Sequence, residues 1–428
     1  MRVALWFLAL FSMAVAAALF AGNNQGTITV FWPPYRVDLS FNLVVLLLAV
    51  LFFTMHVALR ALAALFAMPG HARSWRLQHQ ERGMHVALLE AMAHLVAGRF
   101  IRARKAAEMV LAREAAMSRS GETLAYSARL RALAHLLAAE SAQALQDKSA
   151  RSAHFDQALE QASRQEALGI REGVQLRAAR WSLEDRDASA ALQWLDELPQ
   201  GASRRTIAMR LRLKASRMAR QIRPALEAAR LLAKHRAFSE VAAAGLLRGL
   251  ALELISGAHD PDQMSGVWGQ LDPAERQMPE VAIAATRRML KLGGDMAATR
   301  DWLLPLWDRM VAQPATLSET QRVQLIQVLE SGFAAASGAP ESAWLTRIEK
   351  AHMANPGDAA LQYLAGIACK HLQLWGKAQQ LLKQSLPRLQ DPGLERSAHV
   401  ALAELAEQRG DMGAATQAWR SAALAFKA

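Results

Sequence analysis

The sequence predicts an all-α protein in which a two-helix membrane hairpin precedes an α-solenoid of helix pairs. Two uncharged runs fill most of the first sixty residues, and each is long enough to cross a bilayer. Beyond them Ala, Leu, Arg, Gln and Glu dominate, which is a helical composition. The third observation is an internal similarity between segments 37 residues apart near the C-terminus.

The first two helices are predicted from the uncharged runs at residues 3–21 and 39–59. A helix rises about 1.5 Å per residue, so roughly 20 apolar residues cross the hydrocarbon core. We assign the two spans to these runs, within an anchor of residues 1–70 whose representative residues are Leu5, Ala21, Leu43 and Leu59. A cleavable signal sequence is the alternative for the first run, which contains A-x-A patterns, and the second run would then still stop transfer.

The loop between the spans, residues 22–38, is polar and contains two prolines. Backbone in lipid must be hydrogen-bonded within its own segment, so this turn must lie in water or at the interface. Trp32 and Tyr35 have amphipathic rings that favour the headgroup level. Basic residues follow the second span, which predicts a periplasmic loop, cytoplasmic termini and a location in the cell inner membrane.

The composition argues against several classes of function. The net charge is +12, but the basic residues are interleaved with acidic ones and form no nucleic-acid-binding motif. Cys369 is the only cysteine, which excludes an internal disulfide and a cysteine-based metal site. No dinucleotide, P-loop, zinc-protease or serine-hydrolase motif occurs, so we expect no catalytic residues, no metal site and no enzyme activity.

The helix pairs are clearest at residues 355–428. Alignment at a spacing of 37 pairs Ala378 with Ala415, and helices are predicted at 359–373, 376–386, 395–409 and 412–426. Small residues at these positions let two helices approach closely. The same pattern recurs near residue 100. The residues predicted to pack the repeats are Gly98, Ala103, Gly366, Ala378, Gly410 and Ala415.

These units resemble degenerate tetratricopeptide repeats, in which small residues and a turn glycine recur at fixed offsets. The resemblance implies a stack of helix pairs whose concave face binds a partner. We expect an N-terminal array at 71–260 and a C-terminal array at 261–428, separated by the proline-rich stretch 256–279.

The first hundred residues resemble the proteobacterial HemY family of haem-biosynthesis-associated inner-membrane proteins. The loop residues that carry the likeness include Gly22, Gly26, Ile28, Val30 and Tyr35, and GHARSW at 70–75 follows the second span. The resemblance implies a scaffold that acts in a late step of protohaem formation and binds the terminal enzymes of the pathway or their porphyrins. It assigns no catalytic residue.

Two other functions stay open from the sequence. One is an envelope-assembly scaffold with the same architecture, although the family of that kind carries a four-cysteine module that this chain lacks. The other is a porphyrin-binding or porphyrin-converting protein without a recognisable motif. An apolar groove with one or two Arg residues would suit a porphyrin, so haem or protoporphyrin is the ligand to test.

Overall fold

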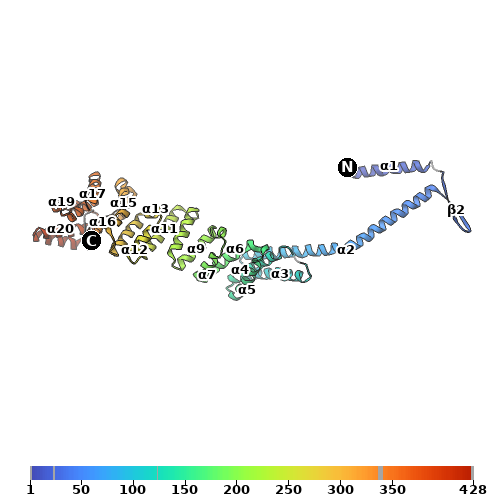
Figure 1. Ribbon diagram of the computed structural model, residues 1–428, viewed down its shortest axis with the longest axis horizontal. Helices are drawn as coiled ribbons and strands as arrows, with labels where there is room; N and C mark the ends of the chain where they lie inside the picture. The colour runs from blue at the N-terminus through green and yellow to red at the C-terminus, as the bar shows by residue number, and fades with distance from the viewer. Residues whose placement is uncertain (1, 23–24, 123, 336–340, 426–428) are drawn as a thin grey trace. The chain divides into compact units, whose positions relative to one another are not determined.

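The computed structural model describes residues 2–22, 25–122, 124–335 and 341–425. Within these ranges the side chains of 2–5, 20–21, 64–74, 296–298, 334–335 and 341–342 are not described. The chain forms two compact units, Met1–Ala167 and Leu168–Ala428 (Figure 1). Apart from one short β-hairpin, the described elements are helices, which confirms the predicted helical class.

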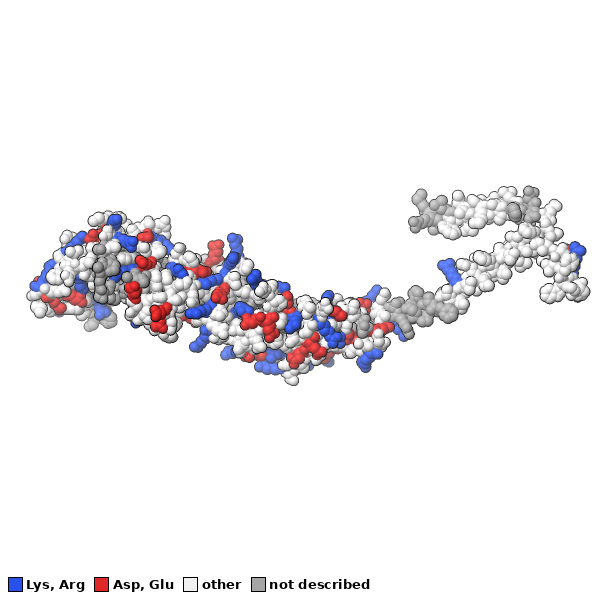
Figure 2. Space-filling model, viewed as in Figure 1, with Lys and Arg blue, Asp and Glu red and all other residues white. Residues whose placement is uncertain are grey.

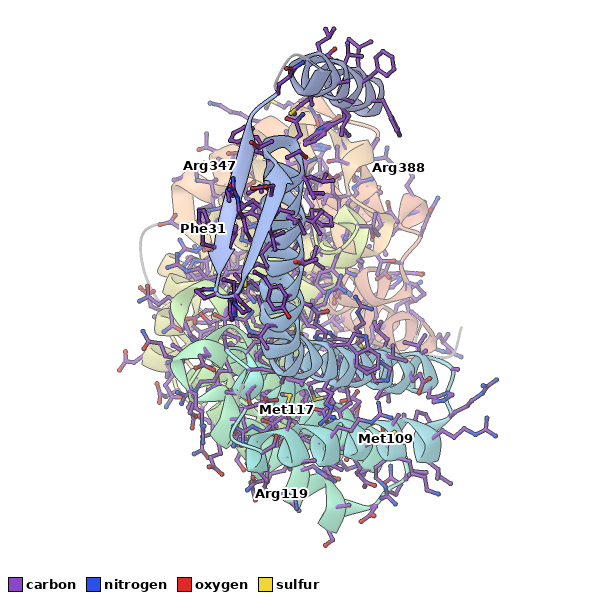
Figure 3. The ribbon with its side chains drawn as sticks, turned by 90° about the vertical axis from the view of Figure 1, so that its right-hand side faces the viewer. Phe31, Met109, Met117, Arg119, Arg347 and Arg388 are labelled. Atoms are coloured by element: carbon purple, nitrogen blue, oxygen red, sulfur yellow. The ribbon has the colours of Figure 1, made fainter. Side chains whose placement is uncertain are left out.

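The first unit contains a hairpin between two helices, followed by a helical bundle. Its elements are α1 (Arg2–Gly22), β1 (Thr27–Trp32), β2 (Tyr35–Ser40), α2 (Phe41–Val96), α3 (Phe100–Arg119), α4 (Ser127–Ala144), α5 (Lys148–Ala162) and the 3₁₀ helix η1 (Gln165–Ala167). Helices α2, α3 and α4 pack against one another around a core that includes Met84, Val110, Met117 and Ala134. Helix α3 buries Met117 in this core and exposes Met109 (Figure 3).

Helix α2 is continuous over 56 residues, from the apolar segment to the bundle. Ser40 caps its start, because the Ser40 hydroxyl accepts the Leu43 N–H at 3.3 Å. At about 1.5 Å per residue the helix is about 84 Å long. The sequence was divided at residue 70, but the helix continues through that position, so the anchor and the array share one element.

Among the described residues, one helical segment is long and apolar enough to cross a membrane, Phe41–Ala63. None of its apolar window is buried by protein, and uncharged side chains cover the start of α2 (Figure 2). In α1 the described apolar stretch is shorter, Trp6–Leu19. The second span is thus present as a helix of sufficient length, and the two-span hairpin stays a prediction.

The second unit is a succession of helices joined by short turns. Its helices are α6 (Leu168–Glu184), α7 (Ala188–Asp196), α8 (Gln200–Ser203), α9 (Thr206–Met218), α10 (Ile222–Lys234), α11 (Glu240–Ser256), α12 (Pro261–Gln270), α13 (Pro273–Arg276), α14 (Pro279–Lys291), α15 (Met296–Ala312), η2 (Pro314–Thr316), α16 (Glu319–Ala335), α17 (Glu341–Ala354), α18 (Ala359–His371), α19 (Trp375–Ser385), η3 (Leu386–Arg388), α20 (Pro392–Gln408) and α21 (Met412–Leu424). Helices α11, α14, α16, α18 and α20 pack in series, each against the next. This is the arrangement of stacked helix pairs.

A left-handed residue followed by a buried alanine marks several of the turns within helix pairs. Nine residues in the described chain have a positive φ angle, and five of them share this pattern, namely Gly98, Arg186, Arg220, Gln373 and Gly410. The residue five positions later is alanine in each case, Ala103, Ala191, Ala225, Ala378 and Ala415, and each of these alanines is at most 3% exposed. The turn directs the next helix back along the first, and the alanine lets the two approach closely. Three of the six packing residues proposed from the sequence therefore occupy this alanine position.

The predicted boundary at residue 260 does not coincide with the division in the structure. One hydrophobic core runs from Met209 to Leu405 and includes Met264 and Trp268 on α12. The prolines at 261, 273 and 279 lie in the first turns of α12, α13 and α14. Proline is well tolerated there because its missing N–H has no partner in the first turn. These prolines begin helices, and the structure divides after Ala167 instead.

Two glycines provide a test of the helix and turn geometry. In α11, Gly249 has open space where a Cβ would stand, so Gly249→Ala is expected to stabilise the protein by about 0.5–1 kcal/mol. Gly410 has a φ of +76°, and Gly410→Ala is expected to destabilise by about 1 kcal/mol. Urea unfolding of both variants checks the pair, and an equal effect of the two would contradict the assigned geometry.

Candidate binding pocket between α9, α10 and α11

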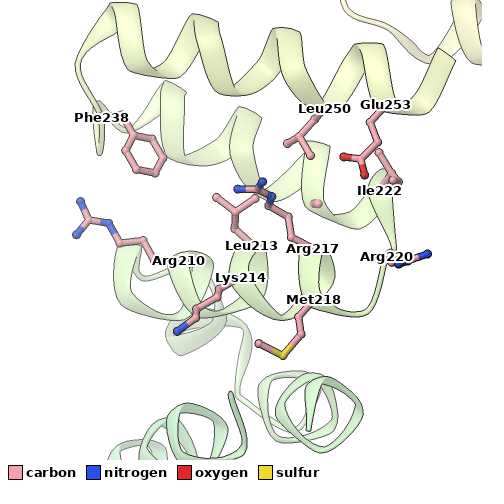
Figure 4. Close-up of a pocket in the computed structure, with 11 residues that line it drawn as sticks. Arg210, Leu213, Lys214, Arg217, Met218, Arg220, Ile222, Phe238, Leu250 and Glu253 are labelled. Carbon is pink, nitrogen blue, oxygen red and sulfur yellow. The ribbon is translucent and has the colours of Figure 1, made fainter. Parts of the chain in front are cut away.

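The strongest candidate site in the described chain is a cavity of about 530 Å³ between α9, α10 and α11 (Figure 4). Pockets for small ligands have volumes of about 300–1,000 Å³. The apolar part of the lining consists of Leu213, Met218, Ile222, Ala225, Phe238 and Leu250. Leu213, Ala225 and Leu250 are buried, so they belong both to the cavity and to the continuous core.

The polar part of the lining is strongly basic. Arg210, Lys214 and Arg217 follow one another on α9 at spacings of four and three residues, which places them on one face of the helix. Arg220, in the left-handed turn to α10, adds a fourth cation. Glu253 on α11 is the one carboxylate in the lining. Like charges at these spacings cost a few tenths of a kcal/mol per pair, so the stripe does not serve the stability of the helix.

The four cations differ in how they are held. The Arg210 Nη2 donates to the Ala237 carbonyl at 2.8 Å, and its guanidinium lies 5.7 Å from the centroid of the Phe238 ring. In Figure 4 the Arg217 side chain extends from α9 toward α11, where Leu250 and Glu253 stand. Lys214 and Arg217 are exposed and form no ion pair with any described residue. The cavity therefore offers apolar surface beside unneutralised positive charge.

A second cavity, of about 670 Å³, lies along α16, α18 and α20. It is lined largely by polar residues, including Glu330, Lys370, His371 and Glu404, and the Lys370 ammonium pairs with Glu404. Burial raises the pKa of Glu330 above its ordinary value, and burial lowers the pKa of His371. The charges here largely compensate one another, so this cavity shows a weaker preference for an ionic ligand than the α9–α11 pocket.

Two histidine side chains in the first unit, His135 and His154, lie close together and were considered as metal ligands. The Nδ1 atoms of His135 and His154 lie 3.1 Å apart, and the His154 Nε2 lies 3.9 Å from the Glu108 Oε1. Within the part of the chain that the structure describes, no group of three His, Cys, Asp or Glu side chains could hold a metal ion. Burial lowers the pKa of His135 to about 4, with smaller effects from His154 and Arg131, and burial also lowers that of His154.

This pair gives a pH prediction for folding. His135 is neutral in the folded state, whereas its pKa in the unfolded chain is near 6.5. The stability it contributes is therefore complete above pH 6.5 and is lost as the pH falls from 6.5 toward 4. Between pH 7.5 and 4.5 the free energy of unfolding of the wild-type protein should fall by roughly 1–2 kcal/mol more than that of His135→Gln. This figure allows for the partial exposure of His135. Urea unfolding at the two pH values measures this difference, and parallel losses would contradict it.

The residues proposed from the sequence do not gather at one site. Gly366 lies on α18, where an added Cβ would stand 2.8 Å from the Leu382 Cγ, so its small size permits close packing of α19. Trp32 and Tyr35 are cross-strand partners in the hairpin and are more than 70% exposed. Leu43 and Leu59 are exposed on α2. Leu5 and Ala21 lie in α1, and their side chains are outside the described residues.

The sequence reading did not single out any residue of the α9–α11 pocket. The sequence RLRLKASRMAR at 210–220 nevertheless indicates a basic surface, because it places Arg and Lys on one face of a helix and contains no Asp or Glu. Over the whole chain basic residues are interleaved with acidic ones, which hides the local excess of basic residues on α9. A count restricted to one helical face would have identified the stripe.

Comparison with known proteins gives one family match. Residues 26–146 match the model described as the N-terminus of the HemY protein. No curated protein matches the sequence. The matched segment covers the hairpin, α2, α3 and α4.

Three of the solved structures that match this chain do so at low sequence identity and low TM-score. The APC/C hetero-tetramer Cut9–Hcn1 is 13% identical over 78% of this chain and 65% of that chain, with a TM-score of 0.28. Naa15/Naa10 bound to HypK is 13% identical over 76% and 56%, with a TM-score of 0.22. The P58(IPK) TPR domain is 14% identical over 76% and 99%, with a TM-score of 0.21. This chain thus covers less than two thirds of the length of the first two of these proteins.

The family match confirms the resemblance read from the first hundred residues. It falls on the hairpin and on the long helix that joins the apolar segment to the bundle. Residues 26–146 of this chain therefore carry the domain that the family model describes as the N-terminus of the HemY protein.

Proposed function

We propose that this protein is a membrane-anchored, non-enzymatic scaffold of helical repeats that acts in a late step of protohaem formation. It would hold the terminal enzymes of the pathway, or their porphyrin intermediates, beside the inner membrane. In this proposal the Phe41–Ala63 segment crosses the bilayer and α1 forms the second span. Both termini face the cytoplasm, and the β1–β2 hairpin faces the periplasm.

The observation that carries the proposal is the continuity of α2. Its first 23 residues form the apolar segment, and its last part packs against α3 and α4 at the start of the array. One helix therefore couples the membrane to the bundle without a flexible linker. Confinement beside a membrane raises the effective concentration of partners that meet there.

Partner capture and porphyrin analysis together test this function. Full-length protein solubilised from cross-linked membranes should co-purify with late haem-pathway enzymes, and a deletion strain should accumulate porphyrin intermediates. A strain that carries a chain deleted for residues 2–63 serves as the anchor control. Absence of these enzymes from the purified material, together with a normal porphyrin profile, would refute the pathway assignment.

The α9–α11 pocket favours a second candidate function, direct binding of a porphyrin. A porphyrin combines an apolar macrocycle with two propionates, and the pocket combines apolar walls with Lys214 and Arg217. Full-length protein in nanodiscs can be titrated with protoporphyrin and with its dimethyl ester, which lacks the two charges. Tighter binding of the free acid supports this function. Equal binding of acid and ester would show that the basic stripe takes no part.

A further inference from the structure

The β1–β2 hairpin is amphipathic on its two faces. Directly opposite residues of an antiparallel pair share a face, and successive residues alternate between faces. The pairs Ile28–Leu39, Val30–Val37 and Trp32–Tyr35 therefore form one face, which is apolar except for the Tyr35 hydroxyl and the Trp32 indole N–H. The pairs Thr27–Ser40, Thr29–Asp38 and Phe31–Arg36 form the other.

The polar face is organised by its own contacts. The Thr29 hydroxyl donates to the Asp38 carboxylate, which also pairs with Arg36 at 3.4 Å. The Arg36 guanidinium lies 5.4 Å from the centroid of the Phe31 ring, which is labelled in Figure 3 and is itself 73% exposed. Apart from the Phe31 ring, the side chains of this face are polar and suited to water.

The apolar face has no protein cover over its outer part. Val30, Val37, Tyr35 and Trp32 are 45%, 46%, 71% and 75% exposed. Isolated two-stranded hairpins are marginally stable in water, and a hydrophobic face needs something to pack against. An apolar strip of this kind on a water-exposed loop requires an occupant.

The attachment of the hairpin identifies that occupant. Its last residue, Ser40, caps α2, and the Phe41 N–H donates to the Gly26 carbonyl at 2.8 Å, which closes the base of the hairpin on the first residue of the apolar segment. If Phe41–Ala63 spans the bilayer, the base of the hairpin lies at the membrane surface. Six residues at about 3.3 Å each give arms of about 20 Å, so the whole apolar face is within reach of the leaflet.

The geometry points to the β1–β2 hairpin as an interfacial membrane element, with its apolar face seated on the outer leaflet of the lipid bilayer. This inference rests on the proposed membrane crossing of Phe41–Ala63. The hairpin lies along the surface, with Trp32 and Tyr35 at the headgroup level and with Thr29, Arg36 and Asp38 in water. It fixes the end of α2 to the membrane surface and so limits tilting of the helix that carries the array.

Spin labels on single cysteines test the orientation of the two faces. The full-length chain carries Cys369→Ser and one of Val30→Cys, Val37→Cys, Thr29→Cys or Arg36→Cys, and is reconstituted in nanodiscs. Accessibility to lipid-soluble oxygen, divided by accessibility to a water-soluble nickel chelate, is measured for each label. We expect this ratio to be roughly threefold or more higher at Val30 and Val37 than at Thr29 and Arg36.

A label at Leu47→Cys tests the membrane crossing separately from the seating of the hairpin, because Leu47 lies within the apolar segment and is 56% exposed. A lipid-like ratio at Leu47 with a water-like ratio at Val30 and Val37 refutes the seating of the hairpin while leaving the span intact. A water-like ratio at Leu47 itself refutes the membrane crossing. Low accessibility of Val30 and Val37 to both reagents, with spin–spin broadening that disappears on dilution with unlabelled protein, would assign the face to a second copy and overturn the inference.

Discussion

Glu275→Ala is expected to destabilise the second unit by about 3 kcal/mol, because it breaks a buried ion pair. The Glu275 side chain is 2% exposed, and it accepts two hydrogen bonds from Arg230, from Nε at 2.9 Å and from Nη2 at 2.6 Å. It also accepts the Asp272 N–H at 3.0 Å in a capping box. The pair links α10 to α13. Its loss leaves the Asp272 N–H unpaired and leaves Arg230 with only the Asp272 carboxylate at 3.2 Å and the Gln270 carbonyl at 3.0 Å.

Urea unfolding of the full-length protein in nanodiscs, followed by the helical circular dichroism signal, measures this loss. Glu275→Gln keeps the shape and an acceptor oxygen, so it should cost about half as much. Glu184→Ala removes an exposed pair with Arg180, whose side chains are 39% and 54% exposed, and should cost no more than about 1 kcal/mol. A Glu275→Ala protein as stable as the Glu184→Ala control would show that the buried pair contributes no more than a surface one.

The helices of the repeats could be predicted from sequence because their packing is local. The predicted helices at 359–373, 376–386, 395–409 and 412–426 match α18, α19, α20 and α21 to within a few residues. Small residues at a fixed spacing record the contact between the two helices of a pair. The turn itself was harder to see, because Arg186, Arg220 and Gln373 occupy the left-handed position that Gly98 and Gly410 occupy elsewhere. The alanine five residues later accompanies these five turns, whereas the left-handed turns at Gln146 and Arg236 lack it.

The N-terminal segment was harder to predict because the spacing of its apolar residues changes from a helical pattern to a strand pattern and back within a few residues. The prolines predict a turn, yet they form only the tip of a hairpin whose strands alternate apolar and polar residues. The predicted anchor ends at residue 70, but α2 continues through Pro69 and Gly70. A proline costs a helix interior about 3 kcal/mol, which the packing of α2 against α3 and α4 can offset. Sequence periodicity does not reveal such compensation.

The α9–α11 pocket could not be predicted because it depends on three helices and a turn. Basic residues on one face of α9 can be recognised, but the sequence does not show that Phe238 and Leu250 approach that face. The array places these residues together because α10 packs against both α9 and α11. The site is therefore a property of the tertiary arrangement, and the sequence supplies only its charge.

Reversal of the two unpaired charges in this pocket is expected to weaken protoporphyrin binding by about tenfold or more. In Lys214→Glu/Arg217→Glu, two cations beside the apolar walls become carboxylates, which repel propionates and leave the pocket with three acids against Arg210 and Arg220. Both side chains are exposed and unpaired among the described residues, so the substitution should leave the unfolding free energy within about 0.5 kcal/mol of wild type. Fluorescence titration in nanodiscs measures the affinity.

Arg223→Glu/Lys234→Glu provides the matched control, since both residues are exposed on α10 outside the pocket and the change in net charge is identical. If long-range attraction to a basic protein were the cause of binding, the two double variants would lose affinity equally and both losses would shrink with added salt. If the pocket holds the propionates, only the α9 variant loses affinity, and the dimethyl ester binds wild type and that variant alike. A local effect of this kind requires that the charges and the apolar walls contact the same molecule.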